Sequence, residues 1–240
     1  MHVSPFHYLP LSLGFFSILL GIFVIVFLLL LLGALRQAYV SVGVSSSTAM
    51  WLLFASLVGS YFNIPVANLP DERVMSNQVI DFFGIQYAMP GVAEWPGTVI
   101  AVNVGGAIIP TLMSLYLLIT RRLWVSAAIA TAAVALVLHW LATPVPGLGI
   151  AVPVFLPALV TAVVALVLSR RDAAPLAYIA GSMGTLIGAD LTNLDKVRGL
   201  GAPVASIGGA GTFDGIFLTG ILAVLLASIF HPGPRPAQLY

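Results

Sequence analysis

Long apolar runs, each about as long as a membrane is thick, are the feature that most limits how this chain can fold. A membrane-spanning helix needs about 20 consecutive apolar residues, and residues 12–35 meet this length without a single charge. Only 7% of the 240 residues are charged and 60% are hydrophobic, whereas an ordinary soluble domain has about 25% charged residues. So few charges cannot cover a water-exposed surface. The sequence therefore predicts a multi-span membrane protein.

The apolar runs are separated by short polar segments. Their spacing predicts an all-α transmembrane bundle of about seven helices, which forms a single integral membrane domain over residues 1–240. The first run has no positive segment before it and is longer than the core of a signal peptide, so we expect a retained helix. The expected spans cover residues 12–35, 47–62, 101–120, 123–141, 153–168, 176–191 and 212–230.

Basic residues predict the orientation, because cytoplasmic loops carry an excess of Lys and Arg. With seven spans, Arg73, Lys196 and Arg198 fall on one side and twice as many basic residues fall on the other. We therefore expect a multi-pass protein of the cell (inner) membrane with its N-terminus outside. The basic residues of the expected inner side are Arg36, Arg121, Arg122, Arg170, Arg171 and Arg235.

Residues 67–97 form the longest polar segment, and this orientation places it outside. Within it, residues 79–89 carry β-forming side chains around Gly84, which predicts a small hairpin lying on the membrane.

Helix-weakening residues gather on the same outer side. The third span begins with a glycine pair followed by Pro110, the fifth follows a Pro/Gly turn at 144–153, and glycines recur within residues 208–215. Irregular backbone at membrane depth is tolerated only where protein or water satisfies its polar groups. We therefore expect these segments to enclose a water-accessible cavity.

Two aspartates, Asp190 and Asp214, stand at the margins of membrane-length apolar runs, whereas the other acidic residues lie in connecting segments. A carboxylate at membrane depth costs about 2.5–3.5 kcal/mol on insertion scales and is a functional-site hypothesis by default. The sixth span ends near Asp190 and the seventh begins near Asp214 on the same side, so we expect both at similar depth. Two close carboxylates share a proton and can act on one water as base and acid.

Each aspartate also has a plainer explanation. Asp214 follows Thr212 at the start of a helix, where a carboxylate caps free N–H groups. Asp190 ends a helix and opposes its dipole, which an ion pair with Lys196 or Arg198 would offset. A small-residue face for close helix packing lies on another side of the same helix. It consists of Gly181, Gly184 and Gly188.

The segment Gly209-Ala-Gly-Thr-Phe-Asp214-Gly resembles the Gly-x-Gly-Asp helix of presenilin, signal-peptide-peptidase and prepilin-peptidase enzymes. There too, a glycine pair precedes the aspartate and an apolar helix follows. Here Thr212 and Phe213 intervene between Gly211 and Asp214, and Asp190 stands in an Ala-Asp-Leu context in place of the usual Tyr-Asp. This resemblance implies an intramembrane aspartyl peptidase with Asp190 and Asp214 as its catalytic residues.

Over most of residues 50–230 the chain resembles a bacterial and archaeal membrane family, the domain of unknown function numbered 1614. The segments that carry this resemblance are Gly59-Ser-Tyr-Phe-Asn-Ile-Pro-Val66, Ala101-Val-Asn-Val-Gly-Gly106, Gly188-Ala-Asp-Leu191 and Ser206-Ile-Gly-Gly-Ala-Gly-Thr-Phe-Asp-Gly215. This family implies no particular chemistry. A short internal echo between residues 102–107 and 205–210 covers only six residues, too few to predict a repeat.

Polar and glycine residues of the outer side complete the candidate site as substrate-binding residues. Alone, His139 is more typical of a membrane interface and Asn63 of a helix end. The candidate substrate-binding residues are Asn63, Asn103, Gly105, Gly106, His139, Asn193, Gly209, Gly211 and Thr212.

Three functions remain open at this point. The first is an intramembrane aspartyl peptidase, a hydrolase acting on a membrane protein or peptide. The second is an ion- or proton-coupled transporter or ion-binding protein, in which unwound carbonyls beside the aspartates would hold Na⁺ or a proton. The third is a non-catalytic accessory protein. Whether the chain is an enzyme and how it oligomerises stay open.

The lipid bilayer is the expected partner in all three cases. No cofactor or metal site is predicted. The chain has no cysteine, which excludes disulfides, thiol chemistry and Cys-ligated metal. A net charge of +1 without a basic patch excludes a nucleic-acid partner.

Overall fold

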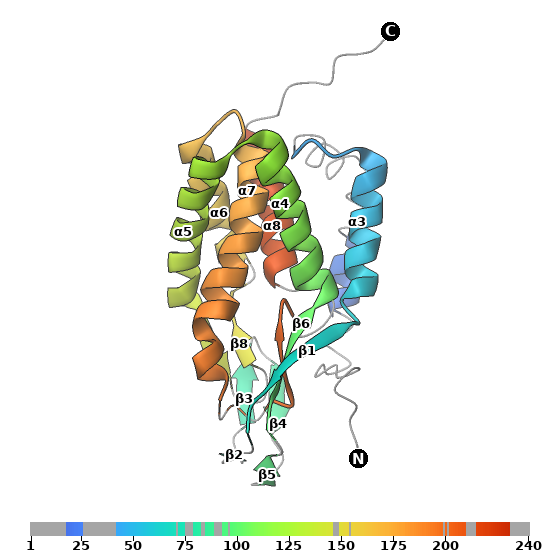
Figure 1. The fold of residues 1–240 in the computed structure, drawn as a ribbon, viewed down its shortest axis with the longest axis vertical. Coiled ribbons are helices and arrows are strands. Elements are labelled where there is room, and N and C mark those ends of the chain that lie inside the picture. Colours follow the sequence, from blue (N-terminus) through green and yellow to red (C-terminus); the bar gives the residue numbers. More distant parts are fainter. Residues whose placement is uncertain are drawn as a thin grey trace.

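The computed structural model describes residues 18–25, 42–70, 72–74, 79–82, 85–88, 93–95, 97–145, 149–153, 155–198, 200, 202–209 and 215–230. The protein is mostly helical, and helices that follow one another in the chain run antiparallel, side by side (Figure 1). Residues 18–25 are helical. The helices that follow are α3 (Ser46–Gly59), α4 (Ile109–Arg121), α5 (Trp124–Leu141), α6 (Phe155–Leu168), α7 (Ala173–Thr185) and α8 (Gly215–Phe230).

Four predicted helical spans are confirmed as helices. Those at 47–62, 123–141, 153–168 and 212–230 correspond to α3, α5, α6 and α8, with differences of a few residues at their ends. The first expected span lies outside the described residues except for the helical residues 18–25.

The third and sixth expected spans are not continuous α-helices. The third begins as strand β6 (Val99–Asn103), continues as the π-helix η1 (Val104–Ile108) and becomes α-helical at Ile109. The sixth is α7, followed by the π-helix η2 (Leu186–Asp190) and the 3₁₀-helix η3 (Leu191–Val197). Wide π-turns inside helices occur frequently at functional sites.

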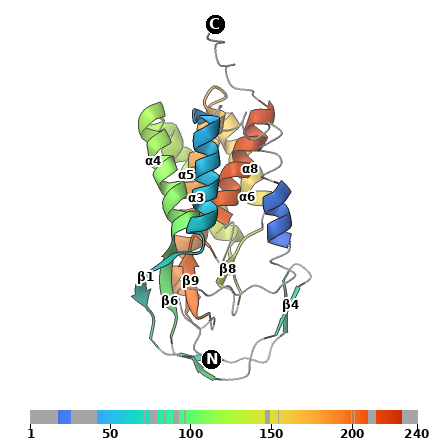
Figure 2. The same ribbon diagram turned by 90° about the vertical axis from the view of Figure 1, so that its right-hand side faces the viewer.

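The expectation of an all-α fold is incomplete, because the chain also forms a three-stranded sheet. β1 (Asn63–Asn68), β6 and β9 (Val204–Ile207) lie in the order β1-β6-β9. β1 pairs antiparallel with β6, and β6 pairs parallel with β9. Figure 2 shows these strands at one end of the helical bundle, next to the ends of α3 and α4. Short runs of β-branched residues beside a helix cannot be told from helix by periodicity alone.

Smaller strand pairs lie at the same end of the molecule (Figure 1). The hairpin predicted at 79–89 is confirmed as β3 (Val79–Phe82) paired with β4 (Ile85–Ala88). The Pro/Gly turn predicted at 144–153 is also a hairpin, of β7 (Thr143–Val145) and β8 (Gly149–Ala151). β2 (Glu72–Val74) pairs with β5 (Ala93–Trp95).

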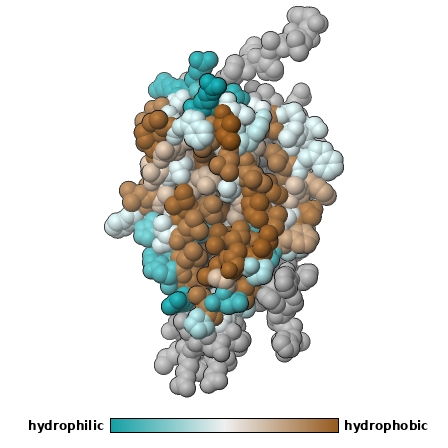
Figure 3. Space-filling view, viewed as in Figure 1, coloured by the Kyte–Doolittle hydropathy of each residue, from teal (hydrophilic) through white to brown (hydrophobic). Residues whose placement is uncertain are grey.

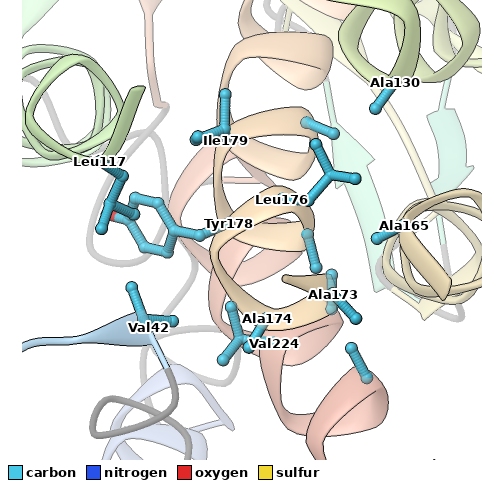
Figure 4. Close-up of a cluster of buried hydrophobic side chains, with 14 of the residues drawn as sticks. Val42, Leu117, Ala130, Ala165, Ala173, Ala174, Leu176, Tyr178, Ile179 and Val224 are labelled. Carbon is cyan, nitrogen blue, oxygen red and sulfur yellow. The ribbon is translucent and has the colours of Figure 1, made fainter. Parts of the chain in front are cut away.

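Helix α7 forms the centre of the bundle. All of its residues except Met183 are buried, and α4, α5, α6 and α8 pack around it. Figure 4 shows Tyr178 and Ile179 facing Leu117 of α4. The predicted small-residue face does pack closely, but against two helices: Gly181 lies against Gly220 of α8, and Gly184 and Gly188 lie against α5.

The face of the bundle seen in Figure 3 carries an apolar belt between two more hydrophilic ends. The belt includes Leu112, Ile119, Val125, Leu136 and Val167, which are all exposed. Two helical segments, Val104–Arg121 and Trp124–Leu141, are long and apolar enough to cross a membrane by length and composition.

Candidate functional site

The candidate site lies where the sheet meets the helices. β6 and β9 run parallel, with Val102 opposite Ile207. Each strand is followed by a glycine pair and then, further along the chain, by a helix, α4 or α8. The short internal echo of the sequence therefore corresponds to two neighbouring strand–glycine–helix units, although the echo itself covers only six residues.

Asp190 is the last residue of the π-helix η2 and is half-buried. Its Oδ2 accepts a 2.8 Å hydrogen bond from the backbone N–H of Gly208. Gly208 follows β9 with a φ of +84°, and a Cβ there would lie 2.6 Å from the backbone nitrogen of Ala107. Only glycine combines this conformation with so close an approach. The turn after β9 is thus fixed between Asp190 and η1.

Asp214, Gly211 and Thr212 lie outside the described residues. Described residues on either side of them lie near η2 and the end of α7. Gly208 bonds Asp190 itself, and a Cβ at Gly215 would lie 3.8 Å from Cγ2 of Thr185 in α7. The pairing of the two carboxylates stays a prediction: the described chain before Asp214 bonds Asp190 through Gly208, and Gly215 after it lies near Val152 and Thr185.

Asn103, Asn63 and Ser206 form a hydrogen-bonded row across the three strands. Asn103 is fully buried; its Nδ2 donates to Asn63 Oδ1 (3.0 Å) and to the carbonyl of Ser60 (2.8 Å). Its Oδ1 accepts from the N–H of Gly106 (2.8 Å), which caps η1. Ser206 Oγ donates to the same Asn63 Oδ1 (2.6 Å). Asn103 therefore joins sheet and helix, and its contact with a substrate stays a prediction.

Glycines allow η1 to lie directly on α3. A Cβ on Gly105 would come within 2.9 Å of the carbonyl carbon of Gly59. Gly209, another predicted substrate-binding residue, has a φ of +136° and donates its N–H to the carbonyl of Ser206 (3.2 Å). These glycines allow the backbone segments of the candidate site to pack against one another without side chains between them.

Asn193 is fully buried behind the π-turn of Asp190. Its Nδ2 donates to the carbonyls of Gly188 (3.0 Å) and Ala189 (2.9 Å), and its Oδ1 accepts from Lys196 Nζ (2.6 Å). A π-turn changes the partners of backbone carbonyls, and Asn193 satisfies two of them. The predicted substrate-binding residue thus holds the backbone that carries Asp190.

His139 connects α5 to the same turn. Its Nδ1 lies 2.9 Å from Thr192 Oγ1, and Thr192 Oγ1 donates to the carbonyl of Gly188 (2.8 Å). Within the described part of the chain, no group of three or more His, Asp or Glu side chains could hold a metal ion.

A comparison with protein families identifies the group to which this chain belongs. The profile of a protein family of unknown function, DUF1614, matches residues 57–226. The chain belongs to the DUF1614 family. Neither a curated protein nor a solved structure matches it, and the comparisons give no support to the resemblance to Gly-x-Gly-Asp peptidases.

The DUF1614 match includes the whole candidate site, from the end of α3 to most of α8. Sequence reasoning alone missed Ser206, Gly208 and Thr192 as parts of it. The sequence feature that points to Ser206 and Gly208 is the similarity of residues 205–210 to residues 102–107. Thr192 gave no signal, because its role depends on the contact of η3 with α5.

Proposed function

We propose that this DUF1614 protein is a multi-span protein of the inner membrane, with its strand-bearing end outside. The apolar belt and the two membrane-length helical segments support this arrangement. Arg121 ends α4 and Arg122 follows it, and Arg170 and Arg171 precede α7, at the end opposite the strands (Figure 1). An arginine-rich end is the one that faces the cytoplasm.

We further propose that Asp190 and Asp214 act together as an aspartyl peptidase on membrane-protein or peptide substrates. The observation that carries this proposal is the 2.8 Å hydrogen bond from Gly208 N–H to Asp190 Oδ2. It ties Asp190 to the segment that leads, within six residues, to Asp214. Carboxylates near the hydrocarbon are retained where they serve function.

The chemistry needs one ionised and one protonated carboxyl group. The N–H of Gly208 stabilises negative charge on Asp190, so we assign Asp190 as the base that takes a proton from water. The water oxygen then bonds to the peptide carbonyl carbon. When the C–N bond breaks, Asp214 donates its proton to the leaving amine.

A hydroxyl-containing peptide that mimics the tetrahedral intermediate tests this proposal. We expect it to bind the protein in nanodiscs, because transition-state mimics bind more tightly than substrates. Asp190→Asn and Asp214→Asn should each abolish binding and also abolish cleavage of a mixture of single-span peptides, followed by mass spectrometry. Asp172→Asn, at the arginine-bearing end, is the matched control and should bind normally. Undiminished binding by both site variants would contradict the proposal.

Cation or proton binding is the second candidate function. The turn after β9 lies against η1, where α4 begins, and bonds Asp190 in η2, where α7 ends. Non-α-helical backbone at helix ends is typical of ion sites in transporters. In this case Na⁺ or proton binding by the purified protein should weaken in Asp190→Asn while the hydroxyl peptide fails to bind the wild type. A protein that binds neither would be the non-catalytic accessory protein.

A further inference from the structure

The apolar belt of the bundle has a measurable height. Trp124 and Trp140 lie at opposite ends of α5, and both are exposed, by 55% and 81%. Tryptophan favours the boundary between hydrocarbon and headgroups. Sixteen residues of α-helix separate the two rings along the chain, which corresponds to about 24 Å.

Other exposed helices agree with this short height. α3 and α6 have 14 residues each, a length of about 21 Å. Exposed apolar side chains on α6 extend from Phe155 to Leu168, over the whole helix. An ordinary bilayer has a hydrocarbon core of about 30 Å. On α3, α5 and α6 the belt is therefore several ångströms shorter than this core, so α5, which is long enough to cross a membrane, would match a thin one best.

The candidate site lies at one edge of this belt. His139 Nδ1 of α5 lies 2.9 Å from Thr192 Oγ1 of η3. Because Trp140 follows His139 in α5, Thr192 and Trp140 lie at about the same height along the bundle. Asp190 precedes Thr192 by two residues, a rise of about 3–4 Å along the helix. Asp190 thus lies within one helical turn of the hydrocarbon boundary that Trp140 marks.

We propose that the belt fits a thin bilayer, with a hydrocarbon core of about 24 Å, and that bilayer thickness controls the access of water to Asp190. Lipids with short acyl chains match the belt and leave the level of Asp190 within one helical turn of the headgroups. In a thicker bilayer, hydrocarbon covers that level unless the lipid deforms, at a modest cost per ångström. This inference rests on the membrane-spanning arrangement proposed above, but it does not depend on the peptidase chemistry.

A cysteine-labelling experiment tests this inference, because the chain has no native cysteine. Leu191→Cys places a thiol on a 44% exposed position next to Asp190, and Asp195→Cys, exposed further along η3, is the control. Each variant is placed in vesicles of monounsaturated phosphatidylcholine with short, medium or long acyl chains. A membrane-impermeant maleimide then reports the exposure of each thiol to water.

We expect labelling of Leu191→Cys to slow about tenfold from short to long chains, while labelling of Asp195→Cys stays constant. Equal rates for Leu191→Cys in the three bilayers would overturn the inference. Single-tryptophan variants that retain Trp124 or Trp140 provide a second measurement. In the short-chain bilayer, lipids brominated near the headgroup should quench the fluorescence of both tryptophans more than lipids brominated near the bilayer centre. Stronger quenching by bromines at the bilayer centre would also overturn the inference.

The labelling experiment and the peptide-binding experiment can fail independently, so the bilayer match and the peptidase proposal are tested separately. If the hydroxyl peptide fails to bind in every bilayer but labelling at position 191 depends on thickness, the aspartate pair is refuted and the bilayer match stands. If the peptide binds equally well in every bilayer and labelling at position 191 is constant, the bilayer match is refuted and the aspartate pair stands.

Discussion

Gly188 lies directly against Ala135: a Cβ at Gly188 would be only 2.6 Å from the Cα of Ala135. The π-turn that carries Asp190 and the middle of α5 are therefore in backbone contact. Small residues allow such contacts between helices in membranes. The position of Asp190 thus depends on a glycine two residues away.

We predict that Gly188→Ala destabilises the protein by about 1–3 kcal/mol, because the added methyl group meets backbone that cannot move independently. The unfolding midpoint in mild detergent measures the effect. Gly21→Ala is the control, since a Cβ at Gly21 would have nothing within 4 Å. Equal stability of the two variants would show that α5 and η2 do not touch this closely.

Gly208 and Gly149 form a matched pair for a second prediction. Both have a left-handed φ, +84° and +111°, but a Cβ at Gly149 would have nothing within 4 Å whereas one at Gly208 would meet Ala107. Gly149→Ala should cost about 1 kcal/mol from backbone strain alone. Gly208→Ala should cost clearly more in the same unfolding assay, because the turn that bonds Asp190 must move. An equal cost would mean that the close approach to η1 is absent.

Asn193 gives a third prediction. Asn193→Ala removes the donor to the carbonyls of Gly188 and Ala189 and should cost about 1–3 kcal/mol, the penalty for unsatisfied buried polar groups. Asn68→Ala, at an exposed position of β1, is the control and should be nearly neutral. Thermal unfolding of both variants in the same detergent provides the comparison. If Asn193→Ala unfolds at the same temperature as the wild type, the amide does not stabilise the fold, and substrate binding stays the predicted role of Asn193.

The proposed orientation gives a fourth prediction. A cysteine at Asp195 should react with an impermeant maleimide added outside intact cells, and a cysteine at Arg171 should react only in inverted vesicles. Both positions are exposed in the bundle, so differences in labelling reflect the side of the membrane. The reverse pattern would place the strand-bearing end in the cytoplasm.

Helices α3, α5, α6 and α8 were predictable from the sequence because each is an apolar run that ends near an arginine, glycine or proline. The sheet was not, since β6 and β9 are short apolar segments whose partners are far apart in the chain. Asn103 shows the difference clearly. The sequence marks it as a polar residue in an apolar run, but only the pairing of β6 with β1 shows that its amide bonds Asn63 and Ser60.

Asp190 was recognisable as a candidate site residue because a carboxylate stands out in an apolar helix. The sequence echo includes its partner Gly208, but the hydrogen bond between them was not recognisable, because a backbone N–H has no signature in the sequence. Asn193 was singled out as substrate-binding because it is a polar residue on the predicted outer side. Its hydrogen bonds to Gly188 and Ala189 depend on a π-turn, which periodicity does not reveal.

The separation of the Asp190 and Asp214 carboxyl groups tests the central proposal most directly. A cryo-electron-microscopy map of the protein in a short-chain lipid nanodisc would measure it. We predict that the two groups lie within hydrogen-bonding reach or share one bridging water. Carboxyl oxygens more than about 8 Å apart and facing away from each other, with no water between them, would contradict the proposed aspartyl peptidase.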